Sequence, residues 1–252
     1  MKKVSILIIL LLLIASTFAI LTKLDIIPNV FKISILCPED DIVIPNEENT
    51  DDDISENPEE KEDYPEMPVA YKPVIYLYPE KEQNVKVNLE YSGKVFVTYP
   101  EYNNGWNVIA KPNGSLINIE DNKEYSYLFW EGKNNIDLTY DMSEGFVVRG
   151  SESLEFLQKK LSLVGLTPRE YNEFIVYWLP QMIENDYNLV HFATKEEYDD
   201  KVILDINPRP DSVLRVFMVL EKISDMKDVK PQSIDTFERN GFTVIEWGGT
   251  IL

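Results

Sequence analysis

The chain has 252 residues and a formal net charge of −20, with 44 acidic residues against 24 basic ones. This balance argues against a nucleic-acid partner, because binding to phosphates requires a basic surface. The only cysteine, Cys37, cannot form an internal disulfide. The only histidine, His191, cannot supply both ligands of a two-histidine metal site, and its position in the apolar stretch 189–192 argues against a histidine-based catalytic triad. We therefore expect neither a metal nor another cofactor.

The N-terminus predicts where the chain works. Met1-Lys2-Lys3 precedes an apolar run over residues 4–21, which as a helix is about 27 Å long and long enough to cross most of a bilayer. The two lysines place the N-terminus in the cytoplasm and the rest of the chain outside. Residues 1–22 are thus a transmembrane anchor or, since 17–19 fit a cleavage site, a signal peptide whose removal releases a secreted protein. Residues 23–37 form a juxtamembrane segment.

The next segment, residues 38–67, is strongly acidic. It has fourteen carboxylates and one base, Lys61, and few apolar residues. Such a segment repels itself and stays unfolded, so we predict a disordered acidic linker that acts as a tether. A cation-binding or partner-binding tail is the alternative. The remaining residues, 68–252, carry a net charge of −10 and have the length of one domain with a sizeable core.

Strand patterns dominate the first half of this domain. Residues 74–78 form an apolar run between two prolines, as expected for a strand buried on both faces. Apolar and polar residues alternate over 85–89 and again over 95–97, on either side of Ser92-Gly93. This pattern predicts a hairpin with one buried face.

A second reversal follows. Residues 106–110 and 115–119 flank Lys111-Pro112-Asn113-Gly114. Proline presets φ for the first turn position, and Asn-Gly tolerates positive φ. The sequence therefore predicts that the chain folds back between two strands.

Two helices are expected next. Leucines and a valine recur at steps of three and four residues over 154–164, and Gly165 stands where a left-handed cap would end that helix. Thr167-Pro168-Arg169-Glu170 is a capping box with proline at the first helical position, and an apolar stripe follows as far as Trp178, before Pro180. We predict an αα-hairpin.

Strands resume after the helices, at residues 189–192, 202–206, 213–220 and 242–246. Strands, then a helical pair, then strands form an α+β pattern. The predicted fold is a mostly antiparallel β-sheet with an inserted αα-hairpin on one face, and with 74–78 and 213–220 as central strands.

Two mirror-image segments carry the candidate chemistry: Phe129-Trp130-Glu131-Gly132 and Glu246-Trp247-Gly248-Gly249. Tryptophan faces stack on sugar rings and carboxylates bind hydroxyl groups, so Trp130 and Trp247 are ligand-binding candidates. Glu131 and Glu246 are candidate catalytic residues if they lie about 5 to 9.5 Å apart, as in glycoside hydrolases. The structural alternative is that each tryptophan fills the core and each glutamate is exposed or paired with an arginine.

Arg215 and His191 both lie within apolar stretches. A buried arginine requires a carboxylate partner, and Asp211, Glu131 and Glu246 are the candidates. Arg215 and Asp211 are also ligand-binding candidates. His191 is expected to be a hydrogen-bonded core residue.

Six sequence blocks occur between residues 69 and 250. They are Lys72–Pro79, Tyr99–Tyr102 with Gly105-Trp106, Tyr127–Gly132, Tyr177–Pro180, Pro210–Ser212 with Arg215–Phe217, and Glu246–Gly249. Together they resemble the recurring blocks of an uncharacterised family of exported bacterial proteins. The resemblance implies that the blocks form one module and that the anchor and linker lie outside it, and it implies no activity.

These observations favour a membrane-tethered extracytoplasmic domain that binds an envelope glycan or protein, or has a structural role at the cell envelope, over an enzyme. The alternative is a carboxylate-based hydrolase of envelope polysaccharide that uses Glu131 and Glu246. Calcium-dependent adhesion through Asp199-Asp200 or Glu120-Asp121 is a third reading, although neither pair has the spacing of a known calcium loop.

Overall fold

The computed structural model describes residues 69–133 and 140–252. The predicted anchor, juxtamembrane segment and acidic linker, with Cys37, lie outside these residues. Within the described ranges, no helix is long and apolar enough to cross a membrane.

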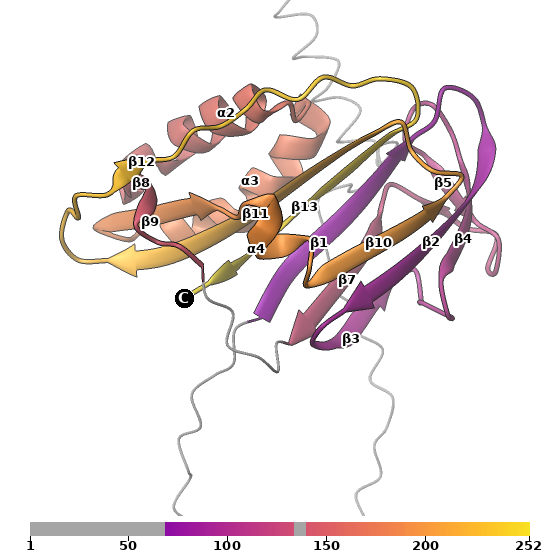
Figure 1. The fold of residues 1–252 in the computed structure, drawn as a ribbon, viewed down its shortest axis with the longest axis horizontal. Helices are drawn as coiled ribbons and strands as arrows, with labels where there is room; N and C mark the ends of the chain where they lie inside the picture. Colours follow the sequence, from indigo (N-terminus) through magenta and orange to yellow (C-terminus); the bar gives the residue numbers. More distant parts are fainter. Residues whose placement is uncertain (1–68, 134–139) are drawn as a thin grey trace, which may run out of the picture. The chain divides into compact units, whose positions relative to one another are not determined.

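The larger of two β-sheets has eight strands. They are β1 (Val69–Tyr78), β3 (Lys94–Tyr99), β7 (Leu128–Lys133), β8 (Glu144–Arg149), β9 (Tyr187–Phe192), β11 (Ser212–Ile223), β12 (Lys230–Pro231) and β13 (Thr243–Ile251). Their spatial order is β12-β8-β9-β11-β13-β1-β7-β3 (Figure 1). Neighbours are antiparallel except for the pairs β11–β13 and β12–β8, which are parallel. The predicted central strands, in β1 and β11, do have neighbours on both sides.

The smaller sheet is fully antiparallel. Its strands are β2 (Gln83–Tyr91), β4 (Trp106–Ala110), β5 (Leu116–Asn118), β6 (Glu124–Tyr125) and β10 (Val202–Asn207), in the order β10-β2-β4-β5-β6. The predicted reversal between β4 and β5 is confirmed: Gly114 has a φ of 83° and donates its N–H to the Lys111 carbonyl at 2.9 Å.

The predicted αα-hairpin is also confirmed. The helical elements are η1 (Gly150–Glu152), α2 (Ser153–Val164), α3 (Pro168–Met182) and the single turn α4 (Lys195–Tyr198). Gly165 ends α2 with a φ of 112°. The Thr167 N–H donates to the Glu170 carboxylate at 2.7 Å, which closes the capping box of α3. This helix runs on through Pro180 to Met182, beyond the predicted end.

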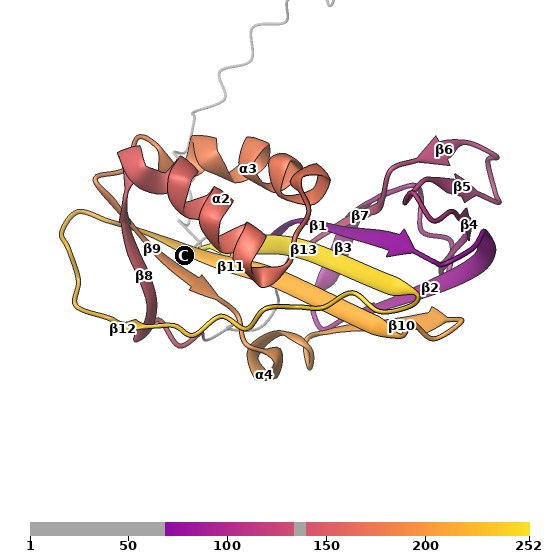
Figure 2. The same ribbon diagram turned by 90° about the horizontal axis from the view of Figure 1, so that it is seen from above.

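The large sheet separates two apolar layers, because side chains alternate along its strands. On one face, Val74, Tyr76 and Trp247 pack with the helical residues Phe174 and Trp178. On the other face, residues such as Ile75, Leu77, Trp130 and Phe217 pack with Val85 and Val87 of the smaller sheet. Figure 2 shows α2 and α3 together on the first face and α4 on the other side of the sheet. The α+β class is therefore confirmed, with a second sheet that the sequence did not predict.

The predicted hairpin of residues 85–89 and 95–97 is wrong. β2 pairs with β4 and β10 in the smaller sheet, whereas β3 pairs with β7 in the larger one. The chain crosses between the sheets at Gly93, where an added Cβ would collide with the Lys133 carbonyl and the Tyr91 ring. Glycine is thus required there for the crossing rather than for a hairpin turn.

Candidate functional site

Glu246 is buried in the centre of the domain, with 1% of its surface exposed. Its carboxylate accepts a hydrogen bond from Arg215 Nε at 2.7 Å and one from Trp130 Nε1 at 3.3 Å. The Arg215 Nη1 group donates to Asp199 at 3.0 Å and to the Val202 carbonyl at 2.7 Å. Both sides of this ion pair are therefore held by further polar contacts.

The charge of Arg215 is stabilised inside the protein. Burial alone would lower the pKa of this guanidinium, but the negative charge of Glu246, its hydrogen bond and the charge of Asp199 act together with Tyr198 against that effect, and the pKa lies above its ordinary value. The guanidinium carbon also lies 4.5 Å from the centre of the Tyr198 ring, where a cation–π interaction adds to the attraction. Of the three partners predicted for Arg215, the structure selects Glu246. Asp199 is a partner that the sequence did not indicate.

Glu131 lies on the opposite face of the large sheet. On β7, Trp130 joins the apolar layer of the smaller sheet, whereas Phe129 packs against the helical layer, so Glu131 faces the helices. Its carboxylate accepts the Lys72 N–H at 3.1 Å. Lys72 has a φ of 50° and stands at an irregularity of β1.

The structure therefore does not bring Glu131 and Glu246 together. A glycosidase pair must flank one scissile bond from a shared cleft, and here the sheet separates the two carboxylates. This arrangement does not support the hydrolase alternative that uses these two residues.

Trp130 and Trp247 are both fully buried, so neither can stack on a sugar. Trp247 packs edge-on against Phe174, with ring centres 5.2 Å apart. Glycine is required at position 249, because a Cβ there would collide with the Trp178 ring. The structural alternative accounts for this segment: the tryptophan fills the core and the glycine permits close packing.

Asp211 and His191 have local partners. Asp211 accepts the Phe242 N–H at 2.7 Å and forms no hydrogen bond with Arg215. His191 is 2% exposed, with Nδ1 2.9 Å from the Glu144 carbonyl and Nε2 2.8 Å from the Glu197 carboxylate. This confirms a hydrogen-bonded core histidine.

Neither acidic pair considered for calcium belongs to a cluster of ligating side chains in the described part of the chain. Among the described residues, no group of three or more His, Cys, Asp or Glu side chains is placed to hold a metal ion. Asp121 instead accepts hydrogen bonds from Asn118 and from the Lys123 N–H, at 2.9 and 3.1 Å.

We expect Glu131→Gln to leave the fold intact and to change how its stability depends on pH. Burial raises the pKa of Glu131 above its ordinary value of 4.5, against the opposing effect of the Lys72 N–H. The folded state therefore binds more protons than the unfolded state just above pH 4.5, and the free energy of unfolding falls as the pH rises through that range.

Glutamine keeps an oxygen for the Lys72 N–H and removes the titration. At neutral pH the free energy of unfolding should change by no more than about 0.5 kcal/mol. Urea denaturation of the wild type and the variant between pH 4 and 7, with about half-unit steps, measures both effects. A slope that stays unchanged in the variant would contradict the assignment to Glu131.

A feature that the sequence analysis missed is an open edge of β11. β9 pairs with β11 only over Met218–Ile223, and the last hydrogen bond joins the Ala193 N–H to the Phe217 carbonyl at 2.8 Å. The chain then leaves the sheet, because Thr194 caps α4. In the part of the chain that the structure describes, residues 212–216 have no strand beside them on this side.

The main-chain groups at this edge follow from alternation. The Phe217 carbonyl points toward β9, so the N–H and C=O groups of Val213 and Arg215, two and four residues earlier, point the same way. None of these four groups has a hydrogen-bond partner among the described residues. They form a short row of free donors and acceptors.

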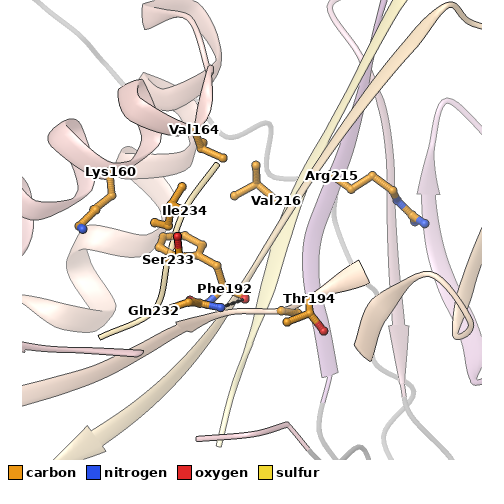
Figure 3. A pocket seen from close by; sticks show the side chains of 10 residues that line it. Lys160, Val164, Phe192, Thr194, Arg215, Val216, Gln232, Ser233 and Ile234 are labelled. Atoms are coloured by element: carbon orange, nitrogen blue, oxygen red, sulfur yellow. Dashed lines mark hydrogen bonds between the residues drawn. The ribbon is translucent and has the colours of Figure 1, made fainter. Parts of the chain in front are cut away.

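Three hollows lie along this edge, and we call them together the β11 groove. The first, of about 170 Å³, has apolar walls from Val164, Phe192, Val216 and Ile234, with the polar residues Thr194, Gln232 and Ser233 and the cation Lys160 beside them (Figure 3). The second, of about 290 Å³, is lined by residues that include Lys195, Tyr198, Asp199 and Val213. The third, of about 500 Å³, is lined by residues that include Asp205, Arg209 and Asp211.

All three hollows border Arg215. In Figure 3 the Arg215 side chain points away from Val216 and Ile234. The structure thus places two of the predicted ligand-binding residues, Arg215 and Asp211, beside the groove, whereas Trp130 and Trp247 are buried away from it.

The described residues define an α+β domain in which an αα-hairpin and a smaller sheet cover opposite faces of an eight-stranded sheet. Comparison with known protein families, curated proteins and solved structures finds no match for the chain.

Proposed function

We propose that the chain is a membrane-tethered extracytoplasmic binding module, and that it binds an extended segment of another polypeptide in the β11 groove. The observation that carries this proposal is the open edge of β11, where four main-chain groups lie free beside three hollows. Strand addition to an open sheet edge is a common mode of peptide recognition.

The extracytoplasmic location rests on the apolar run 4–21 and on the two lysines that precede it. The acidic linker, residues 38–67, supports the same arrangement because it can hold the domain away from the membrane surface.

Cysteine labelling tests both parts of the proposal. In a Cys37→Ser background, Val176→Cys places a thiol at a site that is 76% exposed on α3, and Val213→Cys places one in the groove at a site that is 44% exposed. In intact cells that express the chain, a membrane-impermeant maleimide should label Val176→Cys. It should label Val213→Cys much less, because the bound segment covers that thiol.

The purified full chain in detergent is the control, since both thiols should react there once the partner is removed. If neither thiol reacts in intact cells while both react after lysis, the extracytoplasmic location is wrong. If both react equally in cells, the groove is free and the binding proposal is wrong.

A further inference from the structure

We infer that the interior of the domain binds one water molecule, held by the hydroxyl groups of Tyr91, Tyr140, Tyr198 and Thr250. The site lies in the apolar layer between the two sheets and is separate from the β11 groove, except that Tyr198 borders both. The inference follows from four hydroxyl groups around one small hollow, from its volume and from the charges near it. It does not depend on the proposed function.

The four side chains come from different parts of the chain and line the same hollow, which we call the hydroxyl pocket. Tyr91 ends β2 and Tyr198 ends α4, whereas Thr250 lies on β13 and Tyr140 precedes β8. The rest of the lining is apolar apart from Lys201. The fold thus brings four hydroxyl groups together in an otherwise apolar layer.

The oxygen atoms of all four hydroxyl groups are buried, and none has a hydrogen-bond partner among the described residues. The hydroxyl groups are therefore not bonded to one another either. A buried hydroxyl group without a partner destabilises the folded state, and most buried polar groups are bonded to protein or to ordered water. Four such groups around one hollow indicate a shared ligand.

The hydroxyl pocket has room for a single water molecule. Its volume is about 10 Å³, and a cavity needs about 10–15 Å³ to hold one water. A buried water typically forms about three hydrogen bonds. Water donates two hydrogen bonds and accepts two, and a hydroxyl group can either donate or accept. The four hydroxyl groups can therefore satisfy a water molecule, whereas a larger ligand does not fit.

The hydroxyl groups of the three tyrosines stay protonated at neutral pH. Burial raises the pKa of Tyr91 to about 12 and also raises the pKa values of Tyr140 and Tyr198. Each hydroxyl group therefore keeps its proton and can donate it in a hydrogen bond. The pocket presents neutral groups to its ligand.

Charges of both signs act on the hydroxyl pocket. In addition to burial, the negative charges of Glu197 and Glu246 raise the pKa values of tyrosines there, and the positive charge of Arg215 opposes them. Lys201 lines the hollow, with Nζ 5.1 Å from the centre of the Tyr140 ring. No single sign of charge prevails, which favours a neutral ligand over an ion.

The water would hold Tyr198 in position. The ring of Tyr198 stacks on Phe217, with ring centres 4.4 Å apart, and the guanidinium carbon of Arg215 lies 4.5 Å from the centre of the same ring. Tyr198 also lines the second hollow of the β11 groove. A hydrogen bond to its hydroxyl group therefore fixes the ring that contacts Arg215 beside the groove.

A crystal structure of the full chain, grown with bromide and recorded with anomalous data at the bromine edge, tests the site directly. We expect a water oxygen within about 3.2 Å of at least three of the four hydroxyl oxygens, and no anomalous peak there. A bromide ion at this place would show that the pocket binds anions. An empty pocket, or one filled by another part of the chain, would show that it binds no water. Each of these three outcomes overturns the inference.

Tyr198→Phe and Thr250→Val test the same site by its effect on stability, because each removes one hydroxyl group and changes the shape of the side chain little. Each variant should raise the equilibrium constant for unfolding about threefold to tenfold, as measured by urea denaturation of the full chain in detergent. Tyr99→Phe is the matched control, since Tyr99 is 60% exposed on β3, and it should leave this constant unchanged.

The opposite sign is expected if the hydroxyl groups are dry. Replacing an unpaired buried polar group by an apolar one removes its desolvation cost, so Tyr198→Phe and Thr250→Val would then be as stable as the wild type or more stable. That result would also overturn the inference.

Discussion

Glu246→Ala is expected to lower the free energy of unfolding by about 3–5 kcal/mol, because it leaves the charge of Arg215 buried with only part of its partner set. The variant removes the 2.7 Å contact to Arg215 Nε and the acceptor of the Trp130 N–H. Asp199, whose side chain is 30% exposed, remains as the other carboxylate near the guanidinium. Urea denaturation of the full chain, followed by tryptophan fluorescence, measures the loss.

The matched control is Glu221→Ala. Glu221 forms an ion pair with Lys227 at the same distance, 2.7 Å, but the two side chains are 30% and 49% exposed. A surface pair of this kind contributes about 0–1 kcal/mol. Equal losses for the two variants would show that burial of the Glu246 pair has no energetic consequence, which contradicts the expected result.

A double variant, Arg215→Met with Glu246→Met, separates loss of the pair from loss of one partner. Replacing both charges by apolar side chains removes the uncompensated charge, and such replacements are often neutral or stabilising. We expect the double variant to recover a large part of the stability that Glu246→Ala loses. A loss as large as that of Glu246→Ala would indicate that the polar contacts of Asp199 and Trp130 depend on the pair.

The helical hairpin could be predicted because its signals are local. Gly165 ends one helix and the Thr167–Glu170 box begins the next, and both act within a single turn of chain. The pairing of Arg215 with Glu246 was also among the predictions, since a buried charge requires an opposite one.

The pairing of β2 and β3 was predicted wrongly because strand partners depend on distant residues. Alternation in residues 85–89 shows which side chains are buried but not which sheet buries them, and on β3 the alternation does not even predict burial, because Val97 is 38% exposed. The mirrored Trp–Glu segments do not form the expected shared site, for a related reason. Neighbours in a strand point to opposite faces, so Trp130 and Glu131 cannot line one site, and neither can Glu246 and Trp247.

The β11 groove depends on where two strands end relative to each other. β9 stops at Phe192 because Thr194 and Glu197 form a capping box that starts α4, whereas β11 begins at Ser212, six residues before its pairing with β9 starts at Met218. The capping box was visible in the sequence. Its consequence for the sheet edge required the register between β9 and β11.

Trp247→Ala is expected to lower the free energy of unfolding by about 3–5 kcal/mol, the range for removing a large aromatic side chain from a core. Trp247 is fully buried between the sheet and α3, against Phe174. Thermal or urea denaturation of the full chain measures the effect. Phe96→Ala is the control, because Phe96 is 48% exposed on β3 and its removal should change stability by no more than about 0.5 kcal/mol.

The comparison of these two aromatic residues also decides between the two readings of the Glu246–Gly249 segment. A tryptophan that stacks on a ligand is exposed in the free protein, so its removal would weaken ligand binding and leave the stability nearly unchanged. A tryptophan that fills the core has the opposite signature, because its loss leaves a cavity between α3 and the sheet. If Trp247→Ala is as stable as Phe96→Ala, the assignment of Trp247 to the core is wrong. That result would favour a ligand-binding role for the Glu246–Gly249 segment.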